Sequence, residues 1–91
     1  MKFDNKIKTP RIGSLIRIKD LEWYEKNKDK NGFVGLFVYP MTEYLKKEAF
    51  IVDIIKIKHG PNRGVIAYKI SIDINKKNWN WPIESFDVIK Y

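Results

Sequence analysis

The sequence predicts a mainly β fold, a small and strongly bent antiparallel barrel of about five strands with one or two short helical turns. Three observations support this fold class. Short segments such as "SLIRIK" and "VIAYKISIDI" alternate apolar and other residues, which is the strand period. Gly, Pro and Asn punctuate the chain between these segments, as turns require. No long stretch carries the apolar spacing of an amphipathic helix.

The chain has 91 residues, which suits one domain with one small core. Residues 1–11 are basic and contain Pro10, so we expect a tail or an edge segment there. The barrel domain is then expected over residues 12–91. Its first strand is predicted over residues 14–19, where Ile16 and Ile18 share a face.

A long charged loop is predicted after the first strand. Asp20 suits the N-cap of one or two helical turns over residues 21–27. Residues 33–39 are expected to form a short strand. Pro40 ends that strand, and residues 41–45 suit a single helical turn.

Two longer strands are predicted next. Residues 48–58 carry apolar side chains on both faces, which indicates a strand that is central, curled or covered by a loop. Residues 59–64, "HGPNRG", suit a turn. Residues 65–74 have the cleanest period-two pattern, with isoleucines and Tyr68 on one face.

The C-terminal segment is expected to close the barrel. Trp79 and Trp81 are predicted to share one face of a strand. "IESF" suits a helical or 3₁₀ turn, and residues 87–91 suit a closing strand. We interpret Trp81 and Phe86 as core residues, since large aromatic side chains dominate small cores. These elements favour an SH3-like barrel, with an OB-type barrel as the alternative.

Composition restricts the function. The net charge is +7, with 18 basic and 11 acidic residues and no cysteine. Disulfides and cysteine-ligated zinc are thereby excluded. Basic charge favours anionic partners, although a lysine-rich, AT-rich coding composition explains it equally well. No apolar run reaches membrane-spanning length, and no signal peptide is recognisable. We therefore expect a cytoplasmic protein and no membrane partner.

Catalytic and metal sites are not indicated. His59 is the only histidine and stands in a turn beside a glycine and a proline, where an exposed residue is expected. No nucleophile elbow occurs, and the acidic residues lack the spacing of a calcium loop. We predict a protein that is not an enzyme and that holds neither a metal nor a cofactor.

The order of motifs resembles that of a family of small phage and prophage proteins. The matching segments are "IGSLIRIKDLEWYEKNKD", "MTEYLKKEAFIVDII" and "YKISIDINKKNWNWPIESFDVI". The resemblance covers residues 12–89 and implies an SH3-like barrel. Lys46 departs from the family pattern, in which glycine is common before "KEA". Because small phage proteins often act on host machinery, the resemblance also implies a counter-defence role in the cytoplasm of a host bacterium.

Aromatic residues interleaved with basic ones form the candidate ligand site. Bases stack on such rings while cations meet phosphates, and in an SH3-like barrel the early loop and the last full strand commonly flank one groove. The predicted ligand-binding residues are Trp23, Tyr24, Lys26, Lys28, Arg63, Lys76, Lys77 and Trp79. For Trp23 and Trp79, a place in the core is an equally good interpretation.

The expected function is non-enzymatic binding that sequesters or blocks a host component. An anionic nucleotide-type ligand is favoured by a small margin over a host defence protein. A small barrel that binds DNA or RNA is a further alternative. An exposed sheet edge also leaves a homo-oligomer open.

Overall fold

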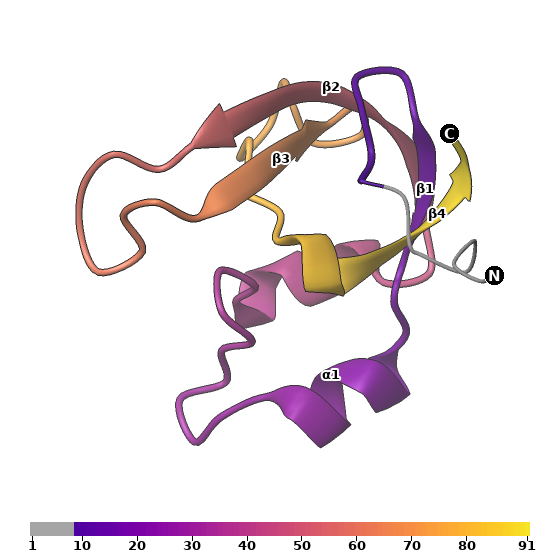
Figure 1. Ribbon diagram of the computed structural model, residues 1–91. Coiled ribbons are helices and arrows are strands. Elements are labelled where there is room, and N and C mark those ends of the chain that lie inside the picture. Colours follow the sequence, from indigo (N-terminus) through magenta and orange to yellow (C-terminus); the bar gives the residue numbers. More distant parts are fainter. Residues whose placement is uncertain (1–8) are drawn as a thin grey trace, which may run out of the picture.

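The protein folds around one antiparallel sheet of four strands, so the predicted mainly β class is confirmed (Figure 1). The computed structural model describes residues 9–91; residues 1–8, most of the predicted tail, lie outside the described residues. The elements in chain order are β1 (Leu15–Ile18), α1 (Leu21–Asn27), the 3₁₀ helix η1 (Tyr39–Tyr44), β2 (Glu48–Lys56), β3 (Ile66–Ile70), the 3₁₀ helix η2 (Ile83–Ser85) and β4 (Phe86–Lys90).

The sheet has the strand order β3-β2-β1-β4. β2 pairs with β1 through its first residues and with β3 through its later ones, and the register shifts between Ile51 and Asp53. Such a shift bends a strand. β2 is therefore central and bent, which is how it carries apolar residues on both faces. It ends at Lys56 rather than at the predicted Lys58.

The predicted loop helix is confirmed as α1. The Asp20 carboxylate accepts a hydrogen bond from the backbone N–H of Trp23 at 3.0 Å, which satisfies one of the free N–H groups of the first turn. The helix buries Tyr24. The Tyr24 hydroxyl donates to the carbonyl of Gly32 at 2.7 Å, so this ring ties the loop that follows α1 back to the helix.

Residues 33–39 form a tight turn instead of the predicted strand. The backbones of Val34 and Phe37 exchange two hydrogen bonds of 2.9 Å each, and this isolated bridge encloses Gly35 and Leu36. Gly35 has a φ of +57°, a conformation that glycine adopts without a side-chain clash. The turn directs Phe37 into the core, where it is fully buried.

β3 ends at Ile70, four residues before the predicted end at Ile74. Turns follow from Ser71 to Lys77, so the alternating pattern beyond Ile70 does not describe a strand. The expected strand around Trp79 and Trp81 is reduced to one bridge between Trp81 and Tyr68, with hydrogen bonds of 2.8 and 3.0 Å. The sheet consequently has four strands instead of about five.

The core lies between the concave side of the sheet and the short helices (Figure 1). Trp81 is fully buried and packs edge-on against Phe37 and Tyr44, with ring centroids 5.7 and 5.8 Å apart. Phe86 packs perpendicular to Tyr68 at 5.4 Å. The core positions predicted for Trp81 and Phe86 are confirmed.

The described end of the predicted tail lies against the domain. Pro10 is buried, and the Arg11 guanidinium donates to the carbonyl of Tyr91 at 3.3 Å. Thr9 to Arg11 thus run beside the C-terminal end of the chain. Among residues 9–91, no helix has the length and apolar character needed to cross a membrane.

Candidate binding groove beside β4

An open groove of about 890 Å³ runs beside β4. This volume falls within the range of known ligand sites. We call it the β4 groove. Its lining comes from the segment before β1, the β1–α1 connection, α1, η2 and β4: Thr9, Pro10, Lys19, Trp23, Ile83, Glu84, Phe86, Asp87, Val88, Ile89 and Tyr91.

Trp23 forms one wall of the β4 groove. Its indole packs edge-to-face on Phe37 at 5.3 Å, with the two rings nearly perpendicular. The backbone of Trp23 is held at both ends, since its N–H is capped by Asp20 and its carbonyl accepts from the Asn27 amide at 2.8 Å. The side chain is half-buried. Trp23 therefore offers a partly exposed aromatic surface in a fixed position.

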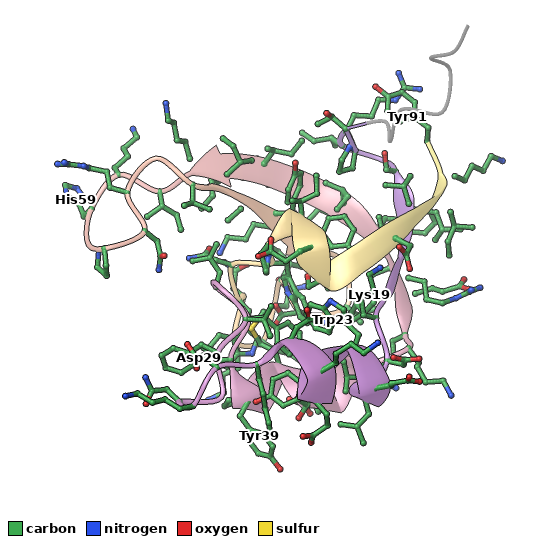
Figure 2. The ribbon with its side chains drawn as sticks, turned by 60° about the horizontal axis from the view of Figure 1, so that its bottom comes forward. Lys19, Trp23, Asp29, Tyr39, His59 and Tyr91 are labelled. Carbon is green, nitrogen blue, oxygen red and sulfur yellow. The ribbon has the colours of Figure 1, made fainter. Side chains whose placement is uncertain are left out.

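Tyr91 stands at the other end of the groove (Figure 2). The Arg11 guanidinium lies 4.1 Å from the centre of the Tyr91 ring, a distance typical of a cation–π contact. The Ser14 hydroxyl donates to the Tyr91 carbonyl at 3.2 Å. The C-terminal residue is thus fastened to the segment that precedes β1.

The charges of the groove lining nearly cancel. Lys19 forms an ion pair with Asp87 at 2.9 Å, and Glu84 adds a second carboxylate. The rest of the lining is mainly apolar, and its largest exposed or half-exposed members are Trp23, Tyr91, Ile83 and Ile89. An apolar lining with few charges suits apolar side chains of a partner better than phosphate groups.

Only Trp23 among the predicted ligand-binding residues lines this groove. Tyr24 differs most from the prediction, because its ring is buried in the core between the helix and the loop. A ligand cannot stack on Tyr24 without unfolding this region. Lys26 is exposed on α1. Lys28 forms an ion pair with Glu25 at 2.8 Å, and this hydrogen bond raises the pKa of the Lys28 amine.

The other predicted residues lie elsewhere. Arg63 is exposed in the hairpin between β2 and β3, close in sequence to His59, which Figure 2 places at the far tip of the molecule from Trp23 and Tyr91. Lys76 and Lys77 are exposed in the turns after β3, and Trp79 follows them. The predicted convergence of Trp23, Tyr24 and Trp79 on one groove is therefore not found in the groove lining.

Asp73 organises the segment that holds Trp79 and Trp81. This carboxylate is buried and accepts hydrogen bonds from the backbone N–H groups of Asn78 and Trp79, at 3.0 and 2.7 Å. It also accepts from the Trp81 indole N–H at 2.9 Å. We call residues 71–81 the Asp73 turn. With three donors on one carboxylate, Asp73 fixes the positions of both tryptophans.

This role of Asp73 was not predicted from the sequence. The residue falls in a regular alternation that predicts an outward side chain on a strand. The available signal was the cluster "DINKKN", because Asp and Asn favour turns by bonding to nearby backbone N–H groups. Asn78 indeed has a positive φ of 54°. Lys69 adds a bond from its ammonium to the Asn78 carbonyl at 2.8 Å, and burial lowers the pKa of this lysine.

Within residues 9–91, no group of three or more His, Cys, Asp or Glu side chains is placed to hold a metal ion. Comparison of the chain with models of known protein families, with curated proteins and with solved structures found no match.

Proposed function

We propose that this protein is a non-enzymatic binding module that holds a segment of another protein in the β4 groove. The observation that carries the proposal is the pairing of a fixed, half-exposed Trp23 with a mainly apolar groove beside β4. Aromatic side chains in partly enclosed apolar surfaces are the residues that most often dominate protein interfaces. The one histidine, His59, stands exposed in a hairpin well away from this groove.

The distribution of charge favours a protein ligand over a nucleotide. A nucleotide site needs cations that are free to meet phosphates. Lys19 in the groove is paired with Asp87, and Glu84 adds negative charge. None of the lysines predicted to meet phosphate lines the groove: Lys26, Lys28, Lys76 and Lys77.

We propose further that the sheet is a reduced SH3-like barrel. The strand order supports this proposal, because β4 returns to lie beside β1, so that the first and last strands of the chain are neighbours in the sheet. η2 stands immediately before the closing strand. The bridge between Trp81 and Tyr68 occupies the place of the missing strand.

The resemblance to small phage proteins supports a partner from a host bacterium. A host protein bound in the β4 groove would be blocked or sequestered by binding alone, without a chemical reaction. We therefore propose that the protein acts in the cytoplasm of a host bacterium against a host component, most plausibly one of its defence proteins.

A matched pair of variants tests the groove. Ile89 is 43% exposed and lines the groove, whereas Ile66 is 42% exposed and lies on β3, outside the groove lining. We expect Ile89→Asp to lose capture of host proteins from a bacterial lysate, and Ile66→Asp to retain it. Equal capture by both variants contradicts the proposed site.

A nucleotide panel tests the rival function. Thermal unfolding is measured with cyclic and linear nucleotides and with single-stranded DNA and RNA. Bound ligand raises the melting temperature by mass action, so we expect no rise with any of these compounds. A rise that disappears in a Lys76→Ala, Lys77→Ala double variant would instead favour the nucleotide ligand.

A further inference from the structure

β4 is an edge strand of the sheet. In the order β3-β2-β1-β4 it pairs with β1 on one side only. An edge strand presents free N–H and C=O groups that pair readily with another extended segment. The identity of the free groups on β4 follows from the hydrogen bonds of its neighbours.

The free groups belong to Phe86 and Val88. The Lys19 N–H donates to the Ser85 carbonyl at 2.9 Å, and in an antiparallel pair the bonded residues alternate with residues that face away. Arg17 and Asp87 are thus the next bonded pair, and Ile18 opposite Phe86 must face away. Ile18 does so, because its N–H donates to the Lys47 carbonyl at 2.9 Å on the β2 side.

The same alternation turns the N–H and C=O of Phe86 and Val88 toward the open edge. No loop or turn within residues 9–91 makes a backbone hydrogen bond to either residue. Both residues also line the β4 groove. Backbone groups that have no partner among residues 9–91 therefore lie beside an apolar groove, which is the combination used when an extended peptide adds a strand to a sheet.

We propose that an extended segment of an acidic partner protein adds to the sheet beside β4 and bonds to the backbone of Phe86 and Val88. This inference rests on the proposed function and specifies how the partner is held. Alternate side chains of the segment are apolar and pack toward Trp23, Ile83 and Ile89. The main-chain bonds give the segment its position, and the groove selects its side chains.

The overall charge of the chain favours a partner whose acidic residues lie outside the groove, because the groove lining itself carries Lys19 against Asp87 and Glu84. The chain carries a net charge of +7, which attracts acidic proteins over long range and opposes pairing of two copies through this edge. Lys90 is exposed at the C-terminal end of β4. An acidic side chain of the partner beyond the apolar positions would meet the Lys90 ammonium.

A peptide selection tests the proposal on the full chain. A library of random short peptides is panned on the protein, with the Ile89→Asp variant used for counter-selection. We expect enriched peptides in which apolar residues alternate and acidic residues are frequent. No enrichment over the variant overturns both this inference and the proposed function.

The selected peptide is then synthesised with N-methyl groups at alternate residues, in the two possible frames. In an added strand, one frame of N–H groups bonds to β4 and the other faces away. We expect the peptide methylated in one frame to bind roughly tenfold or more weakly than the unmodified peptide. The peptide methylated in the other frame should bind nearly as well as the unmodified one. Equal binding in both frames overturns strand addition while leaving groove binding intact.

Amide hydrogen exchange gives an independent measurement. Peptide saturation should slow exchange at Phe86 and Val88, the residues that face the open edge. Asp87 is an internal control, because its N–H already bonds to β1. Unchanged exchange at Phe86 and Val88 in the saturated complex would rule out strand addition.

A pair of charge reversals tests the acidic partner. Lys90→Glu and Lys58→Glu change the net charge equally, and both residues are exposed, but Lys58 lies in the distant hairpin. We expect Lys90→Glu to weaken the selected acidic peptide by about tenfold and Lys58→Glu by only a few-fold. An equal effect of both reversals would contradict the local contact with Lys90.

Discussion

The β4 groove and the Asp73 turn make opposite use of tryptophans that look alike in the sequence. Trp23 and Trp79 both stand near lysines. The backbone of Trp23 is fixed by Asp20 and Asn27, which leaves its indole half-exposed at a groove. The backbone N–H of Trp79 is instead bound by the buried carboxylate of Asp73, and its side chain packs against the core.

The polar neighbour decides the role of each aromatic residue. Asp20 is exposed and organises a helix end, so the ring one turn later stays at the surface. Asp73 is buried and bonds to the Trp81 indole as well as to the backbone, so Trp79 and Trp81 are held against the core while Lys76 and Lys77 stay exposed. Nearby lysines do not distinguish the two cases.

The largest expected effect comes from Asp73→Ala. This variant leaves the Trp79 N–H and the Trp81 indole N–H without their acceptor. The Asn78 N–H loses the carboxylate but keeps the backbone carbonyl of residue 73, at 3.0 Å. Buried donors that lose a charged acceptor cost 1–3 kcal/mol each, so we expect a loss of about 3–5 kcal/mol in the free energy of unfolding. Urea denaturation measures it.

Asp29→Ala is the matched control for Asp73→Ala. Asp29 also accepts two backbone hydrogen bonds, from Asn31 and Phe33, but it is exposed. We expect a loss of roughly 1 kcal/mol or less, since water replaces these bonds. Similar losses in the two variants would mean that burial of Asp73 is not what gives the Asp73 turn its stability.

A second pair of variants separates the two tryptophans by function. Trp79→Ala should cost about 2 kcal/mol, less than a fully buried tryptophan, because the side chain is only partly buried. Trp23→Ala should cost about 1–2 kcal/mol and abolish capture of the groove-bound peptide. Calorimetry and peptide binding are measured together. Loss of peptide binding in Trp79→Ala alone would reverse the assignment of the site.

Two residues with a left-handed backbone conformation should differ by a smaller amount in how their substitution by glycine changes stability. Lys46 has a φ of 70° and Asn78, in the Asp73 turn, a φ of 54°. Because a side chain is strained there while glycine is not, Lys46→Gly should stabilise the protein by about 1 kcal/mol. Asn78→Gly should stabilise the protein by less than Lys46→Gly, because asparagine tolerates this conformation. Thermal unfolding measures both, and destabilisation by Lys46→Gly would contradict the expectation.

The smallest expected effect on stability is the loss caused by tyrosine ionisation, and it occurs only at alkaline pH. Burial raises the pKa of Tyr44 and Tyr68 above the ordinary value of 10.0. Their contribution to stability is complete below pH 10.0 and is lost as the pH rises from there through the raised pKa, because the unfolded chain releases these protons first. Tyr68→Phe should flatten this decline in alkaline urea titrations. An unchanged decline would exclude Tyr68 as a source.

Lys69 changes the stability with pH in the direction opposite to the two tyrosines. Burial lowers the pKa of Lys69 below 10.5, so the unfolded chain holds the proton more tightly just below that pH. Stability should then rise slightly with pH in this window. The Tyr68→Phe comparison is therefore made in a Lys69→Gln background, which removes that rise.

Local patterns predicted the elements whose signal lies within a few residues. Asp20 before an apolar-spaced segment predicted α1, and Trp81 and Phe86 were predicted as core from their size. Residues 33–39 and the end of β3 were predicted wrongly, because alternation cannot distinguish a strand from a tight turn when a glycine or an Asp side chain supplies the bonds.

The sequence by itself determined the mainly β class, the presence of a strand at β2 with apolar residues on both faces, and the capped helix α1. The hydrophobic period and the capping residues act over short distances along the chain, so they can be recognised in the sequence. Only the tertiary structure decided that Asp73 faces inward, that Tyr24 is buried, and that Trp23 meets η2 and the open edge of β4. These outcomes depend on which segments, distant in the sequence, pack together. Short-range sequence patterns do not specify those packing partners.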